Sequence, residues 1–127
     1  MVDSASYSRG KMSATRANLG VRERDIYFEY GRRISRKQME SGTIYLDGVV
    51  QGPVIDNDRR SYSFDHHGDC VRMATLSTCE QVWLALWLGL DPTGMKVVLN
   101  DLDADASIAL WLLRNPWGVE EERVEKL

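Results

Sequence analysis

Strand-like and helix-like segments alternate along residues 43–115, and this alternation restricts the fold more than any other feature of the sequence. Two β-branched segments and a hairpin with a polar turn predict the strands, and a Ser77-x-x-Glu80 capping box opens the first of two apolar helices. The predicted strands are 43–50, 53–56, 61–64 and 95–100, and the predicted helices are 77–90 and 104–115. Strands separated by helices favour an α/β fold with a small, mostly parallel sheet and right-handed crossover helices.

The N-terminal part of the chain carries weaker signals. Residues 1–20 are rich in Ser, Arg, Ala and Gly without periodicity, which predicts a flexible or disordered tail before a single α/β domain at 21–127. A short strand is expected at 25–30, followed by a short helix that a Ser35-x-x-Gln38 capping box opens. Because only about four strands can be placed with a clear pattern, we expect an incomplete core, either truncated or completed by a partner subunit.

Composition excludes several classes of protein. With 127 residues, of which 43% are hydrophobic, the sequence is long and apolar enough for one globular domain. Its longest apolar run, 82–90, is shorter than the roughly 17 residues that a membrane-spanning helix needs. The two cysteines make no disulfide framework and the N-terminus lacks a secretory signal, so we expect a cytoplasmic protein without membrane association.

Charge is distributed unevenly along the chain. Residues 1–40 carry nine Lys and Arg against five acids, whereas residues 41–127 carry seven against fourteen. The basic segment 31–37 is typical of a solvated face, with contact to nucleic acid as the alternative. Nine of the ten acids between residues 41 and 105 are aspartates, a residue that favours caps, turns and metal sites over helix interiors.

Three aspartates alternate in the stretch NDLDAD, which joins a predicted strand to a predicted helix. The carboxylates of Asp101, Asp103 and Asp105 repel one another, and a divalent cation would offset this repulsion better than a helix N-terminus. The alternative is that one aspartate caps the helix while the other two are solvated. An EF-hand is excluded because Ala106 replaces the required Gly and Leu112 the required Glu.

The two histidines of the chain, His66 and His67, follow Asp65 directly at the end of a predicted strand. One imidazole is suited to bind a metal while the other faces a substrate, with Asp65 orienting a ring. Mixed His and Asp ligands favour Mn²⁺, Fe²⁺ or Mg²⁺ over a structural zinc ion. The alternative is a surface turn that carries two exposed histidines.

Together these stretches resemble the DHH phosphoesterase superfamily, whose members include RecJ-type exonucleases, manganese pyrophosphatases and oligonucleotide phosphodiesterases. FDHHGDCVRMATLSTCEQVWLALWLGL is similar to the DHH motif with its following helix, and VVLNDLDADASIALWLL is similar to the D-x-D motif with its strand and helix. VIDNDRRSYSFDHH is similar to a branch of metal-dependent hydrolases and RNA exonucleases. The two main motifs stand in the reverse of the usual order, which suggests a permuted or incomplete DHH-like Rossmannoid core.

The resemblance implies a centre with two metal ions, Mn²⁺ or Mg²⁺. The expected metal ligands are Asp56, His66, Asp103, Asp105 and Asp101. Asp56, with Asp47 as the second choice, matches the aspartate that bridges the two ions. His67 is expected to face the phosphate as a catalytic residue, with Asp65 in support.

The resemblance implies a metal-dependent phosphoesterase that hydrolyses a phosphodiester, a nucleotide or a nucleic-acid end through a metal-activated water. The alternative is a non-catalytic metal- or nucleotide-binding module that acts by oligomerisation. Helical spacing assigns Trp83, Trp87 and Trp111 to packing. Apolar surface that a small sheet leaves uncovered would mark the contact face of a homo-oligomer.

Overall fold

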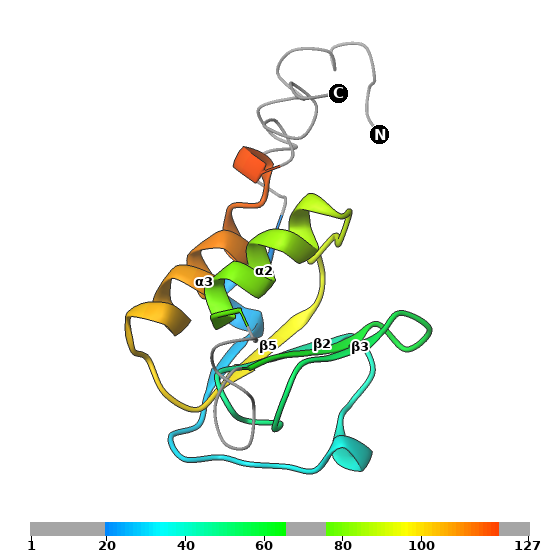
Figure 1. Ribbon diagram of the computed structural model, residues 1–127, viewed down its shortest axis with the longest axis vertical. Coiled ribbons are helices and arrows are strands. Elements are labelled where there is room, and N and C mark those ends of the chain that lie inside the picture. The colour runs from blue at the N-terminus through cyan, green and yellow to red at the C-terminus, as the bar shows by residue number, and fades with distance from the viewer. Residues whose placement is uncertain (1–19, 66–75, 120–127) are drawn as a thin grey trace.

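The computed structural model describes residues 20–65 and 76–119 (Figure 1). This part of the chain contains one sheet, the α-helices α2 and α3, two short 3-10 helices and a further helical segment at 117–119. The strands are β1 (Ile26–Phe28), β2 (Thr43–Leu46), β3 (Val54–Asp56), β4 (Ser61–Phe64) and β5 (Lys96–Leu99). The helices are η1 (Glu23–Asp25), η2 (Arg36–Gln38), α2 (Thr78–Trp87) and α3 (Ala104–Arg114).

The five strands form one mixed sheet in the order β1-β5-β2-β4-β3. β1, β5, β2 and β4 are parallel, and β3 pairs with β4 in the antiparallel sense. The α/β class and the mostly parallel sheet predicted from the sequence are therefore confirmed. The weak signal at 25–30 corresponds to β1, which extends the sheet beyond β5 and makes five strands.

Both α-helices lie side by side on one face of the sheet (Figure 1). α2 links β4 to β5, and because β2 lies between these two strands the connection crosses over β2. Alternate strand residues, among them Ile44, Leu46 and Phe64, point to this face and are buried with residues of α2 and α3. The resulting cluster is the larger of the two cores.

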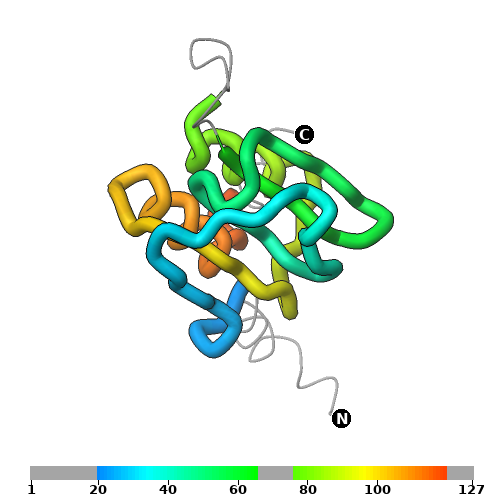
Figure 2. Tube along the Cα trace, turned by 90° about the horizontal axis from the view of Figure 1, so that it is seen from below, coloured from blue at the N-terminus to red at the C-terminus, as the bar shows by residue number. Residues whose placement is uncertain are grey.

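The opposite face of the sheet is covered by irregular chain. The segment between β1 and β2 runs across it, as the view from below shows (Figure 2). Met39, Tyr45, Val49 and Val50 form a second buried cluster there. β2 is consequently covered on both faces, and all four of its residues are buried. This burial agrees with its β-branched and aromatic sequence.

Two predictions from the sequence, the end of the strand at 43–50 and the packing of Trp111, differ from the structure. The strand predicted at 43–50 ends at Leu46, because Asp47 (φ 59°) and Gly48 (φ 97°) adopt left-handed backbone and turn the chain away. The short helix predicted after Ser35 is confirmed as the 3-10 helix η2, and its capping box with Gln38 is present. Trp111, assigned to packing, is 59% exposed on α3.

The N-terminal tail predicted at 1–20 lies outside the described residues except for Gly20. Gly20 N–H donates to Thr93 Oγ1 (3.1 Å), and Val21 N–H donates to the carbonyl of Leu113 (2.9 Å). These bonds fix the start of the described chain against the loop before β5 and the end of α3. Among the helices that the structure describes, none is long and apolar enough to cross a membrane.

Candidate metal centre

Three neighbouring parallel strands end at the same edge of the sheet, and each is followed by a polar residue. Asp47 follows β2, Asp65 follows β4, and Asn100 and Asp101 follow β5. The registers Leu46–Phe64 and Leu46–Leu99 place these ends beside one another. Polar groups from separate parts of the sequence therefore meet at the carboxyl edge of the sheet, where α/β proteins bind ligands.

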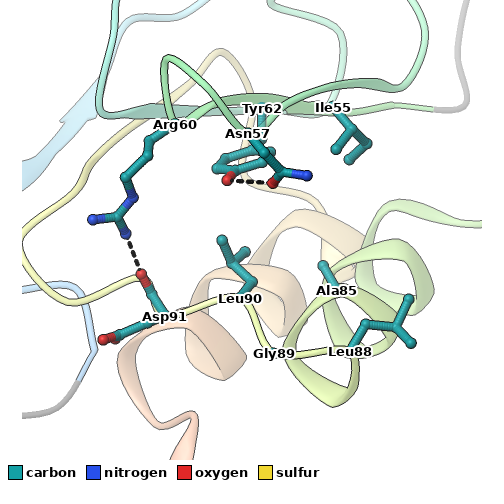
Figure 3. Close-up of a pocket in the computed structure, with 9 residues that line it drawn as sticks. All are labelled: Ile55, Asn57, Arg60, Tyr62, Ala85, Leu88, Gly89, Leu90 and Asp91. Carbon is teal, nitrogen blue, oxygen red and sulfur yellow. Dashed lines mark hydrogen bonds between the residues drawn. The ribbon is translucent and has the colours of Figure 1, made fainter.

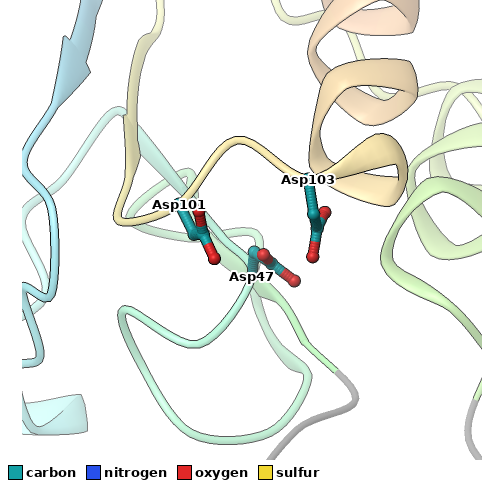
Figure 4. Close-up of side chains that lie close together, drawn as sticks. All are labelled: Asp47, Asp101 and Asp103. Carbon is teal, nitrogen blue, oxygen red and sulfur yellow. The ribbon is translucent and has the colours of Figure 1, made fainter.

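The chain leaves β2 and β5 in opposite directions. After Asp47 it passes to the irregular face, where Val49 and Val50 are buried, and after β5 it enters α3 on the helical face. Ligands of α/β proteins commonly bind where adjacent parallel strands diverge in this way. Asp47, from the loop after β2, lies close to Asp101 and Asp103, from the loop after β5 (Figure 4).

Asp47, Asp101 and Asp103 form a compact acidic cluster. One carboxylate oxygen from each lies within 4.8 Å of those of the other two. Asp47 is 6% exposed, whereas Asp101 and Asp103 are exposed to solvent. Asp103 is also the N-cap of α3, since its Oδ1 accepts a hydrogen bond from Ala106 N–H at 2.8 Å. Capping uses one oxygen of Asp103 and leaves the other to face the cluster.

The donor set fits a hard divalent cation. Carboxylate oxygens are the preferred ligands of Mg²⁺, Mn²⁺ and Ca²⁺, and three of them within one coordination sphere favour such an ion over zinc or copper. The three negative charges also repel one another, and the repulsion is strongest at Asp47 because burial lowers the local dielectric constant. The cluster therefore gives the chain a group of three acidic residues that could hold a metal ion.

Asp65 is almost fully buried, at 1% exposure, directly behind the cluster. Its Oδ2 accepts from Gly52 N–H (2.8 Å), and its backbone carbonyl accepts from Gln81 Nε2 (3.0 Å). A Cβ on Gly48 would lie 3.7 Å from Asp65 Oδ1, so this carboxylate also lies beside the turn that carries Asp47. Asp65 holds the loop after β2 and the start of α2 against the end of β4.

Asp105 has a different role from Asp103. Its carboxylate accepts hydrogen bonds from Thr78 N–H (3.0 Å) and Cys79 N–H (2.7 Å) at the N-terminus of α2. Burial, followed by the neighbouring Asp105 carboxylate, raises the pKa of the Cys79 thiol. The structure does not bring Asp105 into the cluster; instead this residue joins the first turn of α3 to the first turn of α2.

Asp56 lies at the opposite end of the sheet from the cluster. It pairs with Ser61, the first residue of β4, because β3 runs antiparallel to β4. Its Oδ1 accepts from Arg59 N–H (3.2 Å) within the β3–β4 turn. The sequence favours Asp56 over Asp47 as the aspartate that bridges the two metal ions. The short turn at 57–60, however, implies an antiparallel hairpin, which places Asp56 at the end of the sheet away from the cluster. The Asp47-Gly48 pair is typical of a turn, and this local signal indicates that β2 ends at Leu46 with Asp47 at its carboxyl end.

A cavity of about 530 Å³ also lies at this amino end of the sheet, between the β3–β4 turn and the end of α2 (Figure 3). Tyr62 Oη donates to Asn57 Oδ1 (2.9 Å), and the Arg60 guanidinium donates to the carbonyl of Asp91. The first bond lies within the hairpin, and the second ties the turn to the segment that follows α2. None of the clustered aspartates lines this cavity.

His66 and His67 lie outside the described residues and follow Asp65 directly in the sequence. The sequence prediction for these two side chains thus stays a prediction. Comparison with protein-family models, with curated proteins and with solved structures found no match to this chain.

Proposed function

We propose that this protein is a divalent-metal-dependent phosphoesterase with a DHH-like core. The observation that carries the proposal is the convergence of Asp47, Asp101 and Asp103 at the edge of the sheet where β4 leads into the DHH sequence. β2 supplies Asp47, β5 supplies Asp101 and Asp103, and β4, which pairs with β2, leads into the DHH sequence.

In this proposal Asp47, Asp101 and Asp103 hold the metal, together with His66, and the complement is two ions of Mn²⁺ or Mg²⁺. Bound there, such ions supply an activated water at neutral pH and neutralise charge on the phosphate oxygens. Asp65 supports the site by fixing the loop after β2 and the start of α2, and His67 faces the substrate phosphate. Asp47 takes the bridging position for which the sequence favours Asp56.

The reversed motif order is compatible with this proposal. β2 lies between β4 and β5, so the DHH and D-x-D segments flank the same central strand whichever comes first in the chain. Residues at the carboxyl ends of adjacent parallel strands meet regardless of chain order. A permuted DHH-like core would consequently keep the same arrangement of ligands.

The surface beside the cluster favours a substrate that combines phosphate with an aromatic base. Glu29 N–H and Gly31 N–H donate to the carbonyls of Leu99 and Asn100, which holds the segment after β1 next to the end of β5. Tyr30 in this segment is 82% exposed, and the adjacent segment contains the basic stretch that begins at Arg32. Exposed aromatic and basic side chains bind bases and phosphates, so we propose a nucleotide or a nucleic-acid end as the substrate.

Hydrolysis of a model phosphodiester tests the proposal. We expect bis(p-nitrophenyl) phosphate to be hydrolysed with Mn²⁺ and not with EDTA, and the activity to be lost in Asp47→Asn and His66→Ala. Asp56→Asn serves as the control, because it removes a carboxylate at the opposite end of the sheet. Mn²⁺ binding by electron paramagnetic resonance without hydrolysis would favour the alternative, a non-catalytic metal-binding module. If the protein neither binds Mn²⁺ nor hydrolyses the phosphodiester, both the phosphoesterase proposal and the metal-binding alternative are refuted.

A further inference from the structure

Asn100 lies between β5 and Asp101, and its side chain is buried. It is 8% exposed, and the carboxylate of Asp101, the next residue, belongs to the acidic cluster. The Asn100 Nδ2 lies 3.9 Å from the position that a Cβ on Gly48 would take, beside the turn that carries Asp47. The amide of Asn100 is therefore in place next to the two backbone segments that carry the cluster.

Residues 29–32 form a tight turn after β1, which we call the Tyr30 turn. Arg32 N–H donates to the carbonyl of Glu29 (3.0 Å), and the Arg32 guanidinium donates to the Glu29 carboxylate. Gly31 has a φ of 75°, a left-handed backbone that glycine adopts without strain at the third position of a turn. Tyr30 stands at the second position and is 82% exposed. The turn is closed by its own hydrogen bonds, and the aromatic ring at its tip is accessible to a ligand.

Asn100 binds the Tyr30 turn at two points. Its backbone carbonyl accepts from Gly31 N–H (3.0 Å), and its Nδ2 donates to the carbonyl of Arg32 (2.9 Å). Because Arg32 offers an acceptor there, the nitrogen of the Asn100 amide faces it, and this fixes the orientation of the side chain. The first bond needs only the backbone of residue 100, whereas the second needs the amide side chain. Asn100 thus links the Tyr30 turn to the residue that precedes a clustered aspartate.

We infer that Asn100 is a positioning residue, which holds the Tyr30 turn beside the metal centre so that the base of a nucleotide stacks on Tyr30 while its phosphate binds the metal. This inference rests on the proposed function. The Cα atoms of Asn100 and Asp101 are about 3.8 Å apart, as in any trans peptide, so the turn and the Asp101 carboxylate are fixed to adjoining residues. Stacking on an exposed ring adds affinity when the ring is already held in place, because less entropy is lost on binding.

Titration calorimetry with AMP and with inorganic phosphate, each in the presence of Mn²⁺, tests the inference. Inorganic phosphate lacks the base, so only the affinity for AMP reports on the Tyr30 turn. We expect Tyr30→Ala to weaken AMP binding about tenfold, which is in the range for stacking of one base on an aromatic side chain. Asn100→Ala is expected to weaken AMP binding about tenfold as well, because the turn is no longer held in place. Both variants should bind inorganic phosphate nearly as tightly as wild type.

The double variant Asn100→Ala with Tyr30→Ala shows whether Asn100 acts through Tyr30. If it does, the double variant binds AMP about tenfold more weakly than wild type, as each single variant does. Additive losses of about a hundredfold would overturn the inference. Asn115→Ala is the matched control, because its Nδ2 likewise donates to a backbone carbonyl, that of Trp111 (2.9 Å), at the far end of α3. Circular dichroism checks folding, and Asn100→Ser, whose shorter side chain also loses the bond to Arg32, replaces Asn100→Ala if that variant is unfolded.

The outcomes separate this inference from the proposed function. A wild-type protein that hydrolyses the model phosphodiester but binds AMP no more tightly than inorganic phosphate would overturn the inference and leave the proposed function standing. A protein that neither binds Mn²⁺ nor hydrolyses the phosphodiester would refute the proposed function and this inference with it. The expected pattern of AMP affinities without hydrolysis would support the inference for a binding module without catalysis.

Discussion

Replacement of Asp47 by Asn is expected to stabilise the metal-free protein while removing its response to metal. Asn keeps the shape of the side chain and tolerates the left-handed backbone of this position (φ 59°), so the change removes little except one negative charge. The Asp47 carboxylate lies within 4.8 Å of two others. Each such pair repels by about 1 kcal/mol at the dielectric constant of water and about 3.5 kcal/mol at an effective value of 20.

Because Asp101 and Asp103 are exposed, solvent screens much of this repulsion, and we expect a net gain of about 1–2 kcal/mol in the free energy of unfolding. Urea denaturation in EDTA measures it. Wild type should gain about 2.7 kcal/mol when Mn²⁺ is present at a hundredfold excess over its dissociation constant, and Asp47→Asn should gain none. Destabilisation by Asp47→Asn in EDTA, with no effect of Mn²⁺ on wild type, would refute the argument, since Asp47 would then be a structural hydrogen-bonding group.

The structure leads to three further predictions. Asp105→Asn should lower the free energy of unfolding by about 1–3 kcal/mol, because it weakens charge-assisted bonds to the N-terminus of α2, yet it should leave the Mn²⁺ stabilisation unchanged in the same urea titrations. Gly20→Ala should lower the melting temperature, because its φ is +88° and a Cβ would lie 2.7 Å from the Leu113 carbonyl oxygen. In a Cys70→Ser background, Cys79 should react with iodoacetamide near pH 8 more slowly than a free thiol, because its raised pKa keeps it protonated, and reaction at the free-thiol rate would contradict that direction.

The raised pKa of Cys79 also determines in which direction the free energy of unfolding changes with pH. The folded state raises the pKa of this thiol, so folding favours its protonated form. The contribution to stability is fully present below the pKa of the unfolded thiol and is lost as the pH rises through the higher pKa of the folded protein. Cys79→Ser should accordingly flatten the decline of the melting temperature on the alkaline side.

Local signals in the sequence predicted most of the fold. The capping box at Ser77 and Glu80 is present, with Glu80 N–H donating to Ser77 Oγ at 3.3 Å. α2 begins at Thr78, directly after Ser77. The polar turn at 57–60 closes the predicted hairpin. These features depend on residues within a few positions of one another, and therefore the sequence alone is enough to place them.

The arrangement of the site depended on contacts that are distant in sequence. The predicted start of the helix at residue 104 distinguishes Asp103, at the N-cap position, from Asp105 in the first turn, but it does not show which of them joins the cluster. Asp105 stays out of the cluster because the backbone amides of Thr78 and Cys79, which lie 27 and 26 residues earlier in the chain, bind its carboxylate. The sequence favours Asp56 over Asp47, but the antiparallel direction of β3 places Asp56 at the opposite end of the sheet from Asp65 and the DHH stretch.

The three aspartates of the NDLDAD stretch thus have different roles at the carboxyl edge of the sheet. Asp103 caps α3 and Asp105 bonds the N-terminus of α2, so two helices present their positive ends beside the cluster. Each helix end offsets a nearby negative charge by only about 0.3–1 kcal/mol, which is less than the repulsion of about 1–3.5 kcal/mol between each pair of carboxylates. Helix capping therefore orients the acidic groups but leaves most of their repulsion in place. A cation bound among Asp47, Asp101 and Asp103 would remove this remainder, and for that reason the response of the wild type and Asp47→Asn to Mn²⁺ distinguishes a metal centre from a capped and solvated loop.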